Sequence, residues 1–174
     1  TEIGAVTFNR LTNLESVTLP EGLLTIKSGS FSGCTDLKTI NLPSTLTAIG
    51  NSTFDNCLSL TELVVPEGVS EIGYAVFKGC TNLRTVTLPT SLTSISKSAF
   101  EGCQSLESIV IPVSVKTIGA NAFAGCSKLE SVVVPAKVSV IEDMTFSGCD
   151  NLRSVTLPEG VTQIGDAAFK DCVA

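Results

Sequence analysis

The sequence predicts a repeat solenoid, a right-handed coil of short parallel strands wound from one 23-residue unit. All eight phenylalanines recur at this step, from Phe8 to Phe169. All seven prolines, from Pro20 to Pro158, and all seven cysteines, from Cys34 to Cys172, keep the same step. One unit cannot bury its own apolar face, so units of equal length must stack in register to form a continuous core.

Seven inward columns of apolar residues form the predicted core, and two of them are uniform in Leu or in Ile. Read from phenylalanine, the unit is F-x-G-C-x-x-L-x-x-V-x-L-P-x-x-L-x-x-I-G-x-x-A, with small departures. One column is Leu14, Leu37, Leu60, Leu83, Leu106, Leu129 and Leu152, and the other is Ile3, Ile26, Ile49, Ile72, Ile95, Ile118, Ile141 and Ile164. We expect both columns to point inward throughout the stack.

A main strand is expected before the proline of each unit. The segment 85–88 alternates outward threonine with inward valine and leucine, which is typical of a short half-buried strand. Proline lacks an N–H group and is tolerated at the end of a strand, so the chain should turn at Pro89 and its equivalents.

A minor strand and a tight or 3₁₀-like turn should complete each unit, with little or no α-helix. The Leu-x-x-Ile segment after the proline predicts the minor strand. The turn contains a glycine column in which a positive φ is expected, as at Gly79. Asn56 and Asp171 replace glycine in this column, and both residue types tolerate the left-handed conformation.

Composition and charge disfavour several function classes. The net charge is −6 and the eleven basic residues are scattered, so we expect no nucleic-acid partner. No apolar run reaches the roughly 18 residues of a membrane span, so no direct membrane insertion is expected. Histidine, the commonest general base, is absent, and no other acid and base pair is evident. The sequence therefore predicts a protein that is not an enzyme and has no cofactor.

The cysteine column predicts a ladder of buried, reduced thiols. Neighbouring coils would lie about 4.8 Å apart, close enough for a disulfide, but thiols in one column point in parallel and their number is odd. Ligands 23 residues apart along a straight line cannot converge on zinc. Packing, rather than metal binding, is the expected role of these cysteines.

The pattern C-x-x-L-x-x-V-x-L-P-x-x-L-x-x-I-G-x-x-A-F-x-G resembles the BspA-like, or treponemal, class of leucine-rich repeat. As in that class, proline follows the main strand and cysteine lies near the turn. The resemblance implies a leucine-rich-repeat solenoid from a bacterial cell-surface or secreted protein linked to adhesion. It carries no catalytic motif to transfer.

The outward residues of the main strands form the candidate binding surface, which by analogy with other leucine-rich repeats should be concave. Its candidate contact residues are Glu62, Val64, Thr85, Thr87, Ser108, Val110, Ser131 and Val133. A protein or glycan ligand would bind there, with Val110 and Val133 as an apolar break in a hydroxyl-rich floor. The alternative is a structural spacer, or an idealised or engineered scaffold, with no ligand of its own.

Two further expectations concern the rim and the ends of residues 1–174. Charge pairs are expected between neighbouring coils: Glu15 with Lys38, Arg84 with Glu107, and Glu130 with Arg153. The chain should form a single solenoid of about 7.5 repeats of 23 residues, cut from a longer array. Its uncapped ends predict end-to-end self-association.

Overall fold

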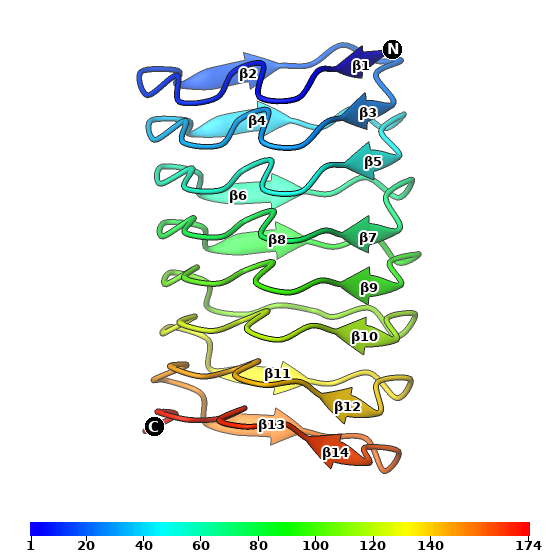
Figure 1. Ribbon diagram of the computed structural model, residues 1–174, viewed down its shortest axis with the longest axis vertical. Helices are drawn as coiled ribbons and strands as arrows, with labels where there is room; N and C mark the ends of the chain where they lie inside the picture. The colour runs from blue at the N-terminus through cyan, green and yellow to red at the C-terminus, as the bar shows by residue number, and fades with distance from the viewer.

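The computed structural model describes all 174 residues as one stack of coils, each coil being one 23-residue unit (Figure 1). Strands of two or three residues pair in parallel between coils, and no helix of any type occurs. In Figure 1 the N- and C-termini lie at opposite ends of a nearly straight column. The predicted parallel-strand solenoid is therefore confirmed, whereas the concavity of its strand surface stays a prediction.

Two rows of strands run along the stack. The main row consists of β2 (Ser16–Thr18), β4 (Thr39–Asn41), β6 (Glu62–Val64), β8 (Thr85–Thr87), β11 (Ser131–Val133) and β13 (Ser154–Thr156). The minor row consists of β1 (Glu2–Ile3), β3 (Thr25–Ile26), β5 (Ala48–Ile49), β7 (Glu71–Ile72), β9 (Ser94–Ile95), β10 (Thr117–Ile118), β12 (Val140–Ile141) and β14 (Gln163–Ile164).

The main row lacks one of its predicted strands. Residues 108–110 occupy the strand position between β8 and β11 but form no ladder with either neighbour. The expectation of one main strand in every repeat is wrong for this coil, although Ser108 and Val110 remain exposed and Ile109 remains buried. The alternation of side chains thus persists where the backbone pairing is lost.

A turn face joins the two rows on the remaining side of each coil. In each turn the N–H groups at the positions of Val6, Phe8 and Arg10 donate to carbonyls 22 residues later in the next coil. This pattern repeats without interruption from the first coil to the last. Bonds spanning three residues, such as Cys34 N–H to the Phe31 carbonyl at 3.1 Å, close each turn locally. The turn face is therefore a continuous backbone ladder without any 3₁₀-helix.

Two columns of this face have positive φ. The predicted column includes Gly33, Gly79, Asn56 (φ 57°) and Asp171 (φ 60°), as expected. The second column, which the sequence did not reveal, is Val6, Gly29, Ser52, Ala75, Ser98, Asn121, Met144 and Ala167. Only one glycine and one asparagine occur in this second column. Its positive φ therefore cannot be recognised in the sequence from the residue types that tolerate that conformation.

Stacked aromatic rings and thiols fill the core behind the turn face. Successive phenylalanine rings from Phe8 to Phe169 have centroids 5.0 to 5.7 Å apart and nearly parallel planes. Each cysteine Sγ donates to the carbonyl of a phenylalanine in the preceding coil, at 3.0 to 3.3 Å. All seven cysteines are free, and all but Cys172 are buried, which confirms the reduced thiol ladder.

Both strand rows are interrupted together at two places along the stack, and the main row also lacks a ladder between β8 and residues 108–110. No ladder joins β4 to β6 or, in the same pair of coils, β5 to β7. Further along, none joins residues 108–110 to β11 or β10 to β12. Figure 1 shows wider separations at these points. We call these two places open boundaries. At the open boundaries the coils are still joined by the hydrogen bonds of the turn face. The N–H groups at the positions of Val6, Phe8 and Arg10 form these bonds throughout the stack.

Candidate functional site

The candidate site is the strand face, which we define as the outward side chains of the main strands together with those of residues 108–110. All eight predicted contact residues are exposed on it. Three valines stand out, with exposed fractions of 66% at Val64, 84% at Val110 and 64% at Val133. The inward residues between them, such as Leu63 and Val132, are buried. The alternation predicted from sequence therefore places these candidates at the surface.

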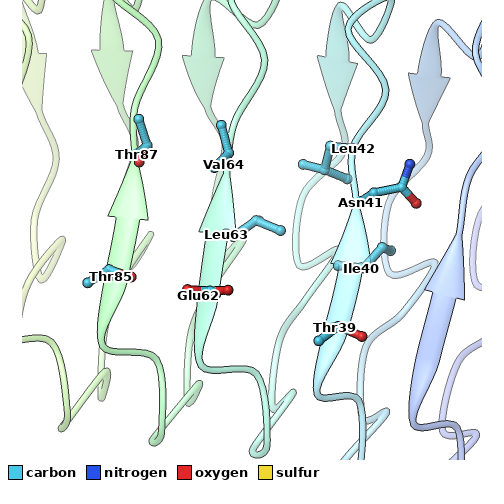
Figure 2. A pocket seen from close by; sticks show the side chains of 9 residues that line it. All are labelled: Thr39, Ile40, Asn41, Leu42, Glu62, Leu63, Val64, Thr85 and Thr87. Carbon is cyan, nitrogen blue, oxygen red and sulfur yellow. The ribbon is translucent and has the colours of Figure 1, made fainter.

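A groove of about 390 Å³ lies on this face at the first open boundary (Figure 2). Its lining residues are Thr39, Ile40, Asn41, Leu42, Glu62, Leu63, Val64, Thr85 and Thr87. Figure 2 shows β4 farther from β6 than β6 is from β8, with the side chains of Leu42 and Leu63 reaching into the gap. The groove thus forms where the hydrogen-bonded ladder between the strands is missing.

The groove coincides with the bulkiest pair of neighbours in the central inward column. The central inward column reads Val17, Ile40, Leu63, Val86, Ile109, Val132 and Val155. Ile40 and Leu63 form the single pair of neighbours in it without a valine, and these two larger side chains stack at the open boundary. Overpacking of this kind displaces backbone. The openings beside residues 108–110 have no such explanation in this column.

Asn41 stabilises the strand pair on the other side of β4. Its Oδ1 accepts the N–H of Leu19 at 2.8 Å, and its Nδ2 donates to the Leu19 carbonyl at 3.1 Å. At the equivalent position in another strand pair, Val65 N–H donates directly to the Thr87 carbonyl at 2.9 Å. The Asn41 amide therefore extends the β2–β4 ladder with a side chain.

The structure divides the predicted site residues into two groups. Glu62, Val64, Thr85 and Thr87 line the groove together. Ser108, Val110, Ser131 and Val133 lie farther along the same face, beside the second open boundary, and do not line it. Thr39 to Leu42 and Leu63 also line the groove and were not predicted from the sequence. Thr39 and Asn41 belong to the same outward columns as the predicted residues. For Ile40, Leu42 and Leu63, the available signal in the sequence was that Ile40 and Leu63 are neighbours in the central inward column.

Glu62 is the single charged side chain among the outward residues of the strand face. It is exposed and makes no ion pair and no side-chain hydrogen bond, whereas Glu67 binds the N–H and the hydroxyl of Thr90 in the next coil. No aromatic side chain lies among these outward residues. The face therefore offers hydroxyls, aliphatic groups and one unpaired carboxylate.

The rim contains fewer ion pairs than predicted. Lys38 Nζ lies 2.9 Å from Glu15 Oε2, which confirms that pair. Neither Arg84 with Glu107 nor Glu130 with Arg153 forms an ion pair, so those two predictions are wrong. Long exposed side chains lose conformational entropy when they are held together, and the attraction in water is too small to enforce every pair.

The thiols and carboxylates elsewhere in the fold are not gathered into a metal cluster or an activated nucleophile. No group of three potential metal ligands occurs in the structure. Burial raises the pKa of the Cys80 thiol to about 12 and raises the pKa of Cys103 well above its usual value. These thiols are thus protonated near neutral pH and poor nucleophiles. The structure also has no helix that could cross a bilayer.

Comparison with known families identifies the repeat. A model of the BspA type leucine rich repeat region matches residues 1–130 and 47–174, with six copies of the repeat. The chain belongs to this family. BspA-type repeats therefore account for the whole of the described stack. No protein with curated information matches the chain.

Solved structures of bacterial leucine-rich repeat proteins share this fold. A leucine-rich repeat protein of T. pallidum is 37% identical, with a TM-score of 0.86 over 91% of this chain and 76% of its own. A leucine-rich cell surface protein of Faecalibacterium prausnitzii is 30% identical, with a TM-score of 0.74 over 97% of this chain. This BspA-type chain spans 55% of the length of the latter.

Proposed function

We propose that this BspA-type chain is a non-catalytic protein-interaction module that recognises a protein ligand through its strand face. The observation that supports it most is the combination of an aliphatic groove with three exposed valines on one continuous face. Protein interfaces have such apolar centres within polar surroundings. The absence of histidine and of clustered metal ligands gives no chemistry to assign in its place.

A location at the bacterial surface or outside the cell is part of the proposal. The F. prausnitzii relative is a leucine-rich cell surface protein. An adhesin-like role, with host or cell-surface proteins as ligands, would use a long rigid array to hold the binding face outward. The uninterrupted turn-face ladder supports such rigidity along the stack.

The proposal is tested by capturing surface and matrix proteins on the immobilised chain. The Val110→Glu/Val133→Glu variant places two charges on the strand face and should lose a captured protein. The matched control is Thr117→Glu/Gln163→Glu, which adds the same charge at exposed positions of β10 and β14. Equal thermal melting of the three proteins excludes unfolding as the cause of a loss.

The spacer alternative makes the opposite expectation. It is favoured by the same uninterrupted ladder, which sets a regular rise between coils on the turn face. A spacer would capture no protein, and charges on the strand face would have no effect on adhesion by a larger protein that contains it. Capture that survives the valine variant but fails with the control would place the binding surface on the minor strands.

A further inference from the structure

We propose that the groove between β4 and β6 is a receptor for an arginine side chain of a partner protein, with an adjoining aliphatic residue packed on Val64 and Leu42. The inference rests on the proposed function, because it names the chemistry that the strand face would recognise. Three independent features of the groove support it: one unpaired carboxylate, unpaired backbone carbonyls and an aliphatic wall.

The carboxylate of Glu62 fixes the charge of the ligand. It lies beside Thr39 and Thr85 at one end of the groove, where it has no basic partner (Figure 2). A negatively charged segment would be repelled, and a neutral one would leave the carboxylate without a charged partner. Charge complementarity therefore favours a cation at this end.

Unpaired carbonyls of β6 supply acceptors for a donor with several N–H groups. Alternate carbonyls of a strand point to opposite neighbours, and Leu63 of β6 is in register with Val86 of β8. The backbone groups of Glu62 and Val64 therefore face β4, where no ladder exists, so their carbonyls are open acceptors beside open N–H donors that include that of Leu42. A guanidinium carries five donors in a planar fork, so it can bind a carboxylate and a neighbouring carbonyl together, whereas an ammonium binds as a point charge.

The aliphatic wall suits the rest of the side chain. Val64 is exposed and Leu42 is half-buried at the opposite end of the groove from Glu62. Arginine buries its methylene stem against apolar surface while its charged end stays near polar groups. A second aliphatic residue from the same partner segment would then cover Val64, which removes apolar surface from water.

The test is titration of the full chain with the tripeptide acetyl-Leu-Arg-Leu-amide, followed by NMR chemical shifts of the backbone amides. Shifts should cluster at residues 39–42 and 62–64, and binding should weaken as salt rises. The same peptide with citrulline in place of arginine keeps the shape and loses the charge, and we expect it to bind about tenfold more weakly.

Matched variants separate the carboxylate from general charge effects. Glu62→Gln should weaken binding of the arginine peptide by about tenfold. Glu71→Gln removes the same charge from an exposed position on β7 of the same coil and should leave binding unchanged. Equal weakening by both variants, equal binding of the citrulline peptide, or shifts located elsewhere would overturn the inference.

The inference and the proposed function can fail separately. A protein that is captured by the chain and released by Val110→Glu/Val133→Glu, but not by Glu62→Gln, would preserve the binding module and reject the arginine receptor. Absence of any captured protein, together with an unresponsive groove in the peptide titration, would reject both.

Discussion

Individual residues in this fold are constrained mainly by backbone conformation at the turns. Val6 has φ of 51°, a conformation that is unusual for a β-branched side chain, and its Cγ1 would lie 3.1 Å from a Cβ built on Gly29. Asn121 occupies the same column with φ of 58°. The Val6 N–H donates a hydrogen bond of the turn-face ladder to the Ser28 carbonyl. This bond requires the same backbone geometry whichever residue occupies the position.

Replacement of Val6 by asparagine should therefore stabilise the chain. Left-handed backbone costs most L-residues about 1 to 2 kcal/mol, and asparagine pays less of that cost. Guanidinium unfolding should show a gain on the order of 1 kcal/mol. Val113→Asn is the control, because Val113 is also exposed but does not have positive φ. An equal gain in both variants would show that strain at Val6 is not the cause.

The buried thiols predict how stability depends on pH. The folded Cys80 thiol has a pKa of about 12, against 9.0 for an ordinary thiol, because burial disfavours the thiolate. The unfolded chain therefore ionises first as pH rises. The contribution of Cys80 is complete below pH 9.0 and declines until about pH 12.

Unfolding by denaturant at several pH values should show this decline at up to about 1.4 kcal/mol per pH unit for one such thiol. Cys80→Ala should be less stable at pH 7 and should have a shallower pH dependence above pH 9.0. Cys172→Ala, at a half-buried cysteine of the last coil, should change the slope less. Identical slopes for wild type and Cys80→Ala would contradict the burial of the thiol.

At the scale of elements, the two strand rows are less continuous than the turns. The residue directly after each main strand shows this difference from coil to coil. Val65 and Val134 donate their N–H groups to the next coil at 2.9 Å, whereas Leu42, Leu88 and Ile111 have no backbone acceptor. The difference depends on the boundary at which each residue lies and not on its residue type.

Hydrogen exchange should separate these amides. We expect the amides of Leu42, Leu88 and Ile111 to exchange faster than those of Val65 and Val134, because only the latter are hydrogen-bonded to a neighbouring coil. The amides of the phenylalanine column should be protected from Phe31 to Phe146. Uniform protection of the five aliphatic amides would mean that the strand rows are not interrupted in solution.

At the scale of the whole molecule, each coil depends on its neighbours alone. The stacked rings, the thiol ladder and the turn-face bonds all connect adjacent coils. Stability in such an array is approximately a sum over coils and their interfaces. A defect in the middle of the stack therefore weakens two interfaces, and one in an end coil weakens one.

Phe77→Ala should destabilise the chain more than Phe169→Ala. Phe77 is fully buried between Phe54 and Phe100, and its removal leaves a cavity expected to cost about 3 to 5 kcal/mol. Phe169, in the last coil, is half-buried and stacks on Phe146 alone. Thermal unfolding followed by circular dichroism compares the two. Equal losses would show that the coils do not behave as a nearest-neighbour array.

Sequence periodicity predicted much of the candidate site. The alternation in Thr85–Thr87 placed its side chains outward because a strand has a side-chain period of two. The same rule placed Val64 and Val110 at the surface, although residues 108–110 form no ladder. The groove was not predicted, because it depends on the distance between two strands and each strand taken alone is regular.

The sequence by itself determined the coil length, the inward columns, the thiol ladder and the family, because a fixed 23-residue step brings the same residue type to the same place in every coil. The tertiary structure decided which strands pair, which charges meet and where the groove opens. Those features depend on small differences between neighbouring coils, such as the meeting of Ile40 with Leu63. The turn-face ladder is the same at every boundary and does not distinguish one pair of coils from another.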